Sequence, residues 1–437
     1  MHPDAPLFPD TVLTHTARTL GTPFYAFSAE ALRARVRGVR AALPMADFLY
    51  SMKANPNVSL VRLISREGMG VEVCSMFEIE ACLVAGVAPS QMIVVGPAKS
   101  HAELIRALQL GVKAIVIESL GEISTLARLC DDLALTQAVA VRINPDFHVP
   151  GARLSMGGKA TQFGIDTNDV GAALALVAGA PRLRLAGLHV YMGTRILDHR
   201  VIEENTRLIL ALADDVARQA GHPLDFVDIG GGWGVAYSDA EQPLSLPSLA
   251  AGLGPVLAAW RDRNPATRVV VELGRYVVAE AGVFVTAVRQ VKMTRGKRFA
   301  TCDGGSNCHS AAGQAASFKR NFPIRALGPV AGAPLVWSIS GPLCTPTDII
   351  AQDVVLPPLA AGSLLCIAQS GAYGLTASPT QFLSFGSPAE VLIDGTGIEV
   401  IREREGFKDL LSRQNPRAIA PPNDPRFADL QPLFEKA

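Results

Sequence analysis

The chain has 437 residues, enough for one large domain and one smaller domain. Forty basic residues balance 40 acidic residues, and this lack of net charge argues against a nucleic-acid or acidic-membrane partner. Apolar residues make up 49% of the chain and charged residues 18%, which excludes a disordered protein. No apolar stretch is long enough to span a membrane, and the N-terminus does not look like a secretory signal. Seven cysteines without regular spacing indicate reduced thiols in a cytoplasmic protein.

Short apolar runs alternate with amphipathic segments from residue 28 to residue 279. The first amphipathic segment predicts a helix with Ser28 as its N-cap and Pro44 as its stop. Eight of the runs are short and rich in β-branched residues, as is typical of strands buried on both faces. These runs are Phe48–Lys53, Val71–Cys74, Met92–Val95, Ala114–Glu118, Ala138–Ile143, Leu185–Tyr191, Phe226–Ile229 and Val269–Glu272.

Three of these runs are followed by the helix-start pattern Ser-x-x-Glu, at Ser75, Ser100 and Ser119. In each, the serine hydroxyl can accept a hydrogen bond from a free backbone N–H, and the glutamate is expected to accept from the N–H of that serine. Eight strands with helical connections predict a (β/α)8 barrel over residues 28–279. A doubly wound open sheet would show the same alternation and stays open as an alternative.

The pattern changes after residue 279 to alternating segments separated by Gly and Pro turns. Examples are Val283–Met293, Pro334–Ser340, Ser363–Gln369 and Ala389–Ile393. Alternation of this kind predicts an antiparallel β domain over residues 280–437. Residues 1–27, with the extended stretch Pro23–Phe27, are expected to join it.

Barrel enzymes carry their chemistry at the carboxyl ends of the strands. The residues expected there are Lys53, Glu72, Ser75, Arg142, His189, Tyr191, Thr194, Gly230–Gly232, Glu272, Gly274 and Arg275. Lys53 closes the first strand, and in one interpretation its side chain simply reaches solvent. In the other, burial at the barrel mouth depresses the pKa of Lys53 and suits it to form a Schiff base.

The run Gly230–Gly232 offers free backbone N–H groups for a phosphate at an expected helix start, or it forms only a tight turn. Gly274 and Arg275 add donors after the eighth strand, where barrels commonly bind phosphate. Glu272 could pair with a cofactor ring nitrogen, or with Arg275 or another base. A Schiff-base lysine, a phosphate site and a carboxylate together describe pyridoxal phosphate, with His189 or Tyr191 stacked on its ring.

With these residues in place, the sequence resembles the fold-type III pyridoxal-phosphate decarboxylases, the group of ornithine, arginine and diaminopimelate decarboxylases. The likeness runs along nearly the whole chain. Its motifs are Tyr50–Asn55, Gly70–Glu78, Phe163–Ile165, Gly187–Thr194, Asp228–Gly232, Glu272–Arg275, Gly341–Asp348 and Ser370–Gly374. The resemblance implies an alanine racemase-like fold with a (β/α)8 barrel and a C-terminal antiparallel β domain, and no metal site.

The resemblance also assigns roles to residues. Lys53 is expected to form the Schiff base with pyridoxal 5'-phosphate, Glu272 to contact the pyridine nitrogen, and Cys344 to act at Cα across a head-to-tail homodimer. Phosphate contacts are expected from Thr194, Gly231, Gly232, Gly274, Arg275 and the hydroxyl of Tyr373, and contacts near the ring from Glu72, Arg142, His189 and Tyr191. Substrate contacts are expected from Cys344, Thr345, Asp348 and Tyr373. Considered without the resemblance, Cys344 is either a reactive or an inert thiol.

Some positions depart from the family pattern. Tyr191 replaces the usual ring-stacking His, and Thr345 replaces the acid that holds the distal ammonium of a diamino substrate. Ala311 stands near the place of the arginine that diaminopimelate decarboxylases use for the distal carboxylate. The sequence is closer to a divergent branch that includes the butirosin-pathway decarboxylase of a carrier-protein-bound glutamyl group.

These features predict a pyridoxal-phosphate-dependent α-decarboxylase in specialised metabolism, acting on an amino acid or on a carrier- or conjugate-linked aminoacyl group. One alternative is a conventional decarboxylase of diaminopimelate, lysine or ornithine. Another is a racemase on the same fold, against which Glu272 argues because a racemase benefits from a poorly protonated ring nitrogen. A third is a non-catalytic cofactor-binding homologue, against which the presence of Lys53 and Cys344 argues.

Overall fold

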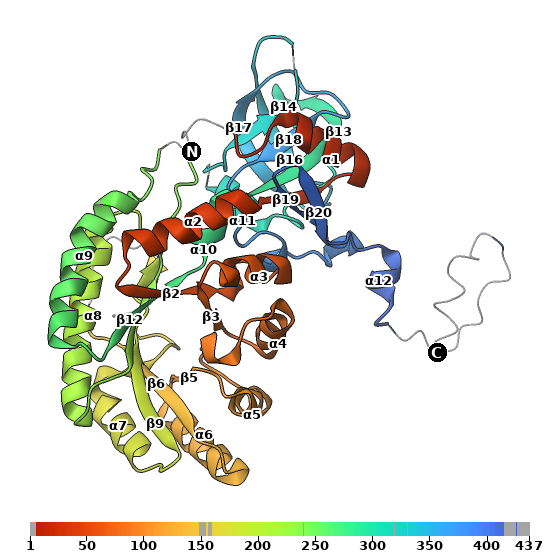
Figure 1. The fold of residues 1–437 in the computed structure, drawn as a ribbon. Helices are drawn as coiled ribbons and strands as arrows, with labels where there is room; N and C mark the ends of the chain where they lie inside the picture. Colours follow the sequence, from red (N-terminus) through yellow and green to blue (C-terminus); the bar gives the residue numbers. More distant parts are fainter. Residues whose placement is uncertain are drawn as a thin grey trace. The chain divides into compact units, whose positions relative to one another are not determined.

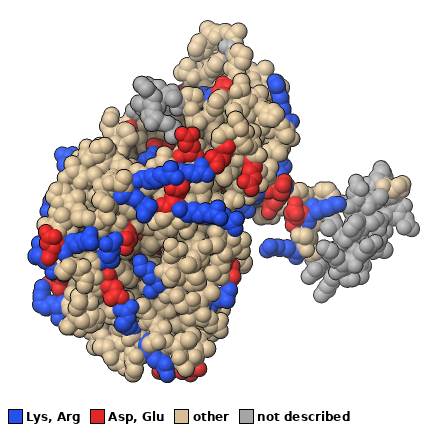
Figure 2. All heavy atoms as spheres, in the orientation of Figure 1, with Lys and Arg blue, Asp and Glu red and all other residues tan. Residues whose placement is uncertain are grey.

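The computed structural model describes residues 6–147, 154–155, 160–238, 240–318, 320–329, 331–414 and 425. The predicted β domain therefore extends, after residue 414, beyond the described residues. The chain divides into two compact units, residues 29–281 and residues 1–28 with 282–437 (Figure 1). Within the described residues, no helix is both long enough and apolar enough to cross a membrane. Basic and acidic side chains are interspersed over the face shown in Figure 2.

The unit of residues 29–281 is a closed parallel barrel of eight strands in the described part of the chain. They are β2 (Ala46–Ser51), β3 (Gly70–Val73), β4 (Met92–Val94), β5 (Ala114–Ile117), β6 (Gln137–Asn144), β9 (Leu183–His189), β11 (Phe226–Gly231) and β12 (Arg268–Leu273). β2 pairs with β12 and β5 pairs with β6, so the sheet closes on itself. Each strand overlaps a predicted run, and the closure of the sheet confirms the barrel and excludes the open sheet.

Helices cover the outside of the barrel (Figure 1). They are α2 (Ala29–Ala42), α3 (Val58–Arg66), α4 (Met76–Ala85), α5 (His101–Leu110), α6 (Leu120–Leu133), α7 (Val170–Ala178), α8 (His199–Ala220), α9 (Leu246–Arg263) and α10 (Arg275–Val278). Shorter elements near the strand ends are η1 (Met52–Ala54), η2 (Pro89–Gln91), β7 (Leu154–Ser155), β8 (Ile165–Asp166), η3 (Thr167–Asp169), β10 (Gly193–Thr194) and η4 (Ala279–Ala281). Apolar side chains of seven strands, among them Leu49, Ala140 and Val270, form a buried cluster.

The three predicted serine caps begin helices α4, α5 and α6. Each serine hydroxyl accepts a hydrogen bond of 3.2–3.3 Å from the backbone N–H three residues later. Glu103 completes the reciprocal bond to the N–H of Ser100, as predicted. Glu78 instead accepts from the N–H of Cys74, one residue before its cap, and the third glutamate makes the same shifted contact. The predicted donor was therefore wrong by one residue at two caps, where the glutamate ties the helix start to the preceding strand end.

The second unit contains a nine-stranded sheet in the described residues. Its strands are β1 (Phe24–Ser28), β13 (Gly282–Thr294), β14 (Lys297–Cys302), β15 (Ile324–Ala326), β16 (Leu335–Ser340), β17 (Ile349–Leu356), β18 (Leu364–Ile367), β19 (Ala389–Asp394) and β20 (Gly397–Arg402). Most neighbouring strands are antiparallel, as predicted, but β1 runs parallel to β19 and β14 parallel to β16. The sheet is thus mixed, because β1 arrives from the N-terminus and enters between β13 and β19.

Helical segments complete the second unit. They are α1 (Asp10–Leu20), α11 (Ser310–Ser317), η5 (Leu375–Ala377), η6 (Phe382–Ser384) and α12 (Phe407–Leu411). Helix α1 was not predicted, and its Leu13 is fully buried in a cluster with Phe24 and Val283 of the sheet. Ser28, the predicted cap of the first barrel helix, is the last residue of β1.

Candidate active site

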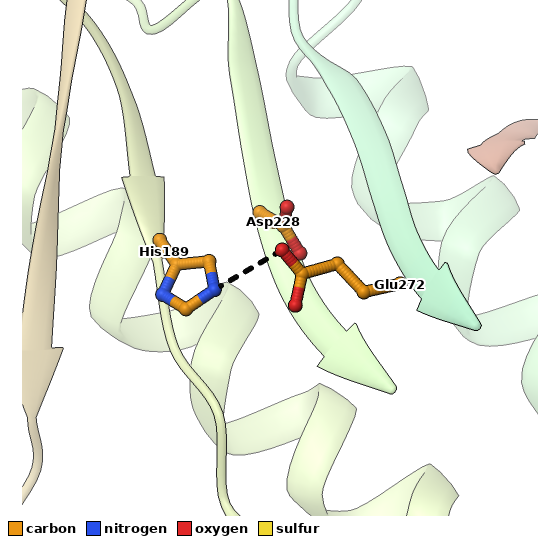
Figure 3. A group of neighbouring side chains, drawn as sticks. All are labelled: His189, Asp228 and Glu272. Atoms are coloured by element: carbon orange, nitrogen blue, oxygen red, sulfur yellow. Dashed lines mark ion pairs between the residues drawn. The ribbon is translucent and has the colours of Figure 1, made fainter. Parts of the chain in front are cut away.

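Three neighbouring strands bring His189, Asp228 and Glu272 together inside the barrel (Figure 3). His189 is the last residue of β9 and lies opposite Asp228 of β11, while Glu272 belongs to β12. A ring nitrogen of His189 and one carboxylate oxygen from each acid all lie within 4.8 Å of one another, and the three side chains are buried. The Nε2 atom of His189 is 3.4 Å from Oε1 of Glu272.

The two carboxyl groups of this cluster respond differently to their surroundings. Burial raises the pKa of Asp228 well above its usual value, and the nearby charge of Glu272 raises it further. Burial also acts to raise the pKa of Glu272, but the interactions of its carboxylate with His189, Lys53 and Arg142 outweigh burial and lower this pKa. The surroundings therefore favour the protonated form of Asp228 and the ionised form of Glu272.

Lys53 lies on η1, immediately after β2, and is held by an ion pair. Its Nζ atom is 3.0 Å from Oε1 of Glu72, a β3 side chain that is only 1% exposed. Burial lowers the pKa of Lys53, but the Glu72 carboxylate outweighs it, with smaller contributions from Cys74 and Glu272, and the pKa ends well above its usual value. The predicted depression of this pKa was wrong because a buried carboxylate stabilises the ammonium form.

Replacing Glu72 should therefore change how the lysine titrates. In Glu72→Gln, the pKa of Lys53 falls, and the pH midpoint for reaction of the cofactor-free protein with pyridoxal 5'-phosphate moves down by about one unit or more. Absorbance stopped-flow measurements from pH 8 to pH 11 check this, because the midpoint of the unaltered protein lies above the usual pKa of lysine. Glu80→Gln is the control, because Glu80 pairs with Arg106 on the surface of α4. An unchanged midpoint in Glu72→Gln would show that another group sets the pKa.

Arg142 and Tyr191 lie at the ends of β6 and β9. Nη1 of Arg142 is 2.8 Å from Oε1 of the buried Glu118, and its guanidinium carbon is 4.9 Å from the centre of the Phe163 ring. Tyr191 is partly buried, with Nζ of Lys53 5.7 Å from the centre of its ring. Of the two residues considered for ring stacking, Tyr191 lies beside the lysine, whereas His189 is paired with Glu272.

The glycines at the carboxyl end of β11 bring the backbone unusually close to its neighbours. A Cβ atom on Gly231 would lie 1.6 Å from the backbone oxygen of Glu272. Gly232 has φ +74°, and a Cβ there would lie 1.9 Å from the backbone oxygen of Gly193, next to Thr194 on β10. The expected helix start at this run was wrong, because the next helix, α9, begins only at Leu246. Gly274, in contrast, is the N-cap of the short helix α10.

An aromatic residue holds Arg275 beside these glycines. Nη1 of Arg275 donates to the hydroxyl of Tyr237 at 2.7 Å. The guanidinium carbons of Arg275 and Arg195 lie 5.5 and 5.4 Å from the centre of the Tyr237 ring. Sequence analysis did not single out Arg195, Tyr237 or Glu118, and it named Asp228 only as the first residue of the motif Asp228–Gly232, without a role. Arg195 directly follows Thr194, and that adjacency was the only local signal for it.

The remaining predicted site residues, Cys344, Thr345, Asp348 and Tyr373, belong to the second unit. Cys344 is exposed, and the hydroxyl oxygen of Thr345 is 3.0 Å from that of Thr347. Asp348 is 2% exposed and accepts hydrogen bonds from the N–H and hydroxyl of Ser306, both at 2.7 Å, and from the N–H of Leu343 at 2.8 Å. Tyr373 has φ +53°, a left-handed backbone.

A lysine at the mouth of a parallel barrel, a glycine backbone cradle and a buried carboxylate define a pyridoxal-phosphate enzyme. The family model described as pyridoxal-dependent decarboxylase, pyridoxal binding domain, matches residues 29–279. The chain belongs to this family, and pyridoxal 5'-phosphate is its cofactor.

Named relatives cover nearly the whole chain. The L-glutamyl-(BtrI acyl-carrier protein) decarboxylase of Niallia circulans is 34% identical, over 92% of this chain and 93% of the relative. The diaminopimelate decarboxylase of Pseudomonas aeruginosa is 31% identical, over 94% and 97%. The crystal structure of Helicobacter pylori diaminopimelate decarboxylase complexed with L-lysine superposes with a TM-score of 0.83 at 27% identity, covering 92% of this chain and 98% of that one.

The barrel residues fit the cofactor chemically. Gly231 and Gly232 leave no space for a side chain, so the backbone alone lines this part of the site, as a phosphate cradle requires. Among the described residues, Oε1 of Glu272 is a buried oxygen without a hydrogen-bond partner, which suits it to a protonated ring nitrogen. Lys53 supplies the amine on the adjacent strand end.

Proposed function

We propose that this enzyme removes the α-carboxylate of an amino acid, or of an aminoacyl group joined to a carrier protein or conjugate, whose distal end is neutral or acidic. The acyl-carrier relative, named for a glutamyl substrate, supports this substrate class. Specialised metabolism is the setting in which we place the reaction.

The observation that carries the proposal is that Asp348 is buried and fully hydrogen-bonded within the protein. It is the only acidic residue in the segment 341–348, and both of its oxygens already accept hydrogen bonds from Ser306 and Leu343. Its side chain is also buried, so it holds the Cys344 loop together rather than offering a charge to a ligand. Thr345 beside Cys344 cannot neutralise an ammonium group, and leaving that charge unpaired costs several kcal/mol. A diamino acid therefore lacks its counter-charge on this loop.

Each barrel residue has a defined task in this reaction. Lys53 holds the cofactor, Glu272 keeps the ring nitrogen protonated, and Arg275 binds the phosphate. Thr194, Gly231, Gly232 and Gly274 complete the phosphate site, while Glu72, Arg142, His189 and Tyr191 border the ring. When bound, pyridoxal phosphate supplies a ring that accepts the electrons left at Cα as carbon dioxide departs.

We further propose that the active enzyme is a homodimer in the cytoplasm. The thiol of Cys344 returns a proton to Cα in the partner's barrel, Asp348 positions that thiol, and Tyr373 of the same unit contributes to the cofactor phosphate. The exposed position of Cys344 supports a role at a shared site. The seven cysteines are all free, which supports a reducing compartment. Analytical ultracentrifugation combined with complementation between Lys53→Ala and Cys344→Ala variants tests the shared site.

An acid placed next to Cys344 should create the missing counter-charge. Thr345→Asp is expected to raise kcat/KM for lysine or ornithine about tenfold, or about 1.4 kcal/mol, and to lower it for acidic substrates. A carbon dioxide assay on both substrate classes measures this, with Thr345→Asn as the control of equal size without charge. Rapid turnover of diaminopimelate, lysine, ornithine or arginine by the unaltered enzyme would contradict the substrate class and favour the conventional decarboxylase.

A further inference from the structure

Asp228 and Glu272 form a carboxyl pair in the barrel interior, on neighbouring strands (Figure 3). Their side chains are 0% and 2% exposed. Within the described residues, Oδ2 of Asp228 and Oε1 of Glu272 are buried atoms without a hydrogen-bond partner. Two neighbouring anions in such a place are strongly unfavourable, whereas one proton between them satisfies both oxygens.

The other oxygen of Asp228 has a defined partner. Oδ1 accepts a hydrogen bond of 2.9 Å from the N–H of Gly230, at the entrance to the glycine cradle. This bond fixes the carboxyl group at the end of β11 and leaves Oδ2 as the oxygen that can bear a proton. Asp228 therefore connects the backbone that cradles phosphate with the carboxylate proposed to face the ring nitrogen.

Charged groups from the surrounding elements limit the ionisation of this pair. Glu72 of β3 faces it together with Lys53 of η1, but these two are paired with each other at 3.0 Å. Arg142 of β6 is paired with Glu118 at 2.8 Å. On β9, His189 approaches Glu272 at 3.4 Å. Because Lys53 and Arg142 each have an acid of their own, they do not compensate a second negative charge on the pair.

We propose that Asp228 is a positioning residue whose Oδ2 carries a proton and donates it in a hydrogen bond to Oε1 of Glu272. This inference rests on the proposed function of Glu272 toward the ring nitrogen. The hydrogen bond holds the Glu272 carboxylate in place and keeps it anionic. The pair then presents one negative charge to one positive ring nitrogen, which matches the charges in the site. The effect of burial on the pKa of Asp228 acts in the same direction.

The variant Asp228→Asn tests, in the cofactor-free protein, whether Asp228 carries a proton. An amide can accept from the N–H of Gly230 and donate to Glu272, but it cannot ionise. The unaltered protein keeps the Asp228 proton when folded and releases it above about pH 4 when unfolded. The contribution of Asp228 to the free energy of unfolding therefore falls as pH rises. Relative to it, the folding equilibrium of the Asn variant should gain up to about tenfold per pH unit between pH 5 and pH 8. Urea unfolding of cofactor-free protein measures this difference.

Three results of that experiment are decisive. A difference that grows with pH, and that shrinks when both proteins also carry Glu272→Gln, supports a proton shared with Glu272. If the difference grows equally when both proteins carry Glu272→Gln, the Asp228 proton is not shared with Glu272. If the Asn variant is less stable by an amount that does not depend on pH, the proposal that Asp228 is protonated is wrong, because Asp228 would then be ionised in the folded protein.

Asp228→Ala tests the positioning of Glu272 in the cofactor-bound protein. The dissociation constant of pyridoxal 5'-phosphate, measured by fluorescence titration, should rise about tenfold or more in the Ala variant, and the Asn variant should restore it to within about threefold. Equal weakening in both variants would overturn the hydrogen bond. If pH-dependent stability behaves as expected while neither variant changes cofactor binding, the proton on Asp228 stands and the ring-nitrogen role of Glu272 fails.

Discussion

Lys53→Arg is expected to abolish decarboxylation, with kcat/KM reduced at least about a thousandfold, equivalent to about 4 kcal/mol of transition-state stabilisation. Arginine keeps the positive charge and can still pair with Glu72, whose carboxylate is 3.0 Å from the lysine nitrogen. The electrostatics beside the carboxylate are thus largely preserved. What is lost is an amine that can give up its proton and join the cofactor, because a guanidinium stays protonated.

Two measurements separate this loss from general damage. Borohydride treatment of protein incubated with pyridoxal phosphate should attach the cofactor to the peptide containing Lys53, and no peptide should be labelled in the Arg variant. Lys113→Arg is the matched control, because Lys113 precedes β5 at the opposite, amino-terminal end of the barrel strands and should leave both results unchanged. Turnover of Lys53→Arg within tenfold of the unaltered enzyme would refute the proposed role of Lys53.

The barrel was predictable because each of its strands is a local feature of the sequence. Strands buried on both faces appear as short, mainly apolar runs, as at Phe226–Ile229, which Asp228 alone interrupts and which the structure extends by two residues into β11. The serine caps are equally local, since Ser100 and Glu103 lie three positions apart. Those signals also placed Lys53 and Glu272 at the correct strand ends.

What sequence reasoning missed depends on contacts between distant strands. Asp228 opens the motif Asp228–Gly232 and interrupts the apolar run of its strand, but its position in the sequence assigns it no role. The role comes from the register that sets it beside His189 and Glu272. The direction of the pKa shift of Lys53 likewise depends on Glu72 from the next strand. Tyr237 reaches Arg275 from a loop whose path no periodic pattern encodes.

In the second unit, too, local features were predictable and contacts between distant segments were not. Its alternating segments predicted β13, β16, β18 and β19, but alternation gives no information on which strands pair in parallel. The mixed order arises because β1 is contributed by the N-terminal segment. Helix α1 was missed because it contains several threonines and one valine, which are poor helix formers, and its N-cap Pro9 offers no side-chain cap.

Gly231→Ala should weaken binding of pyridoxal 5'-phosphate by about a hundredfold, or about 2.7 kcal/mol. A Cβ atom there would lie 1.6 Å from the backbone oxygen of Glu272, so β11 and β12 must separate and the carboxylate must move. Gly171→Ala in α7 is the control, because a Cβ atom at Gly171 meets nothing within 4 Å and should be neutral or stabilise the helix by about 0.5–1 kcal/mol.

Fluorescence titration of cofactor binding and thermal unfolding of the cofactor-free proteins distinguish two ways in which Gly231→Ala can act. Overpacking costs about 1–3 kcal/mol of stability in either case, because the clash is with backbone rather than with a flexible side chain. If stability falls but the cofactor binds with its normal affinity, the backbone after β11 is only a tight turn, and the phosphate is held elsewhere. If both fall together, the close approach of Gly231 to Glu272 couples the phosphate cradle to the carboxylate, since one displaced strand disturbs both ends of the cofactor site.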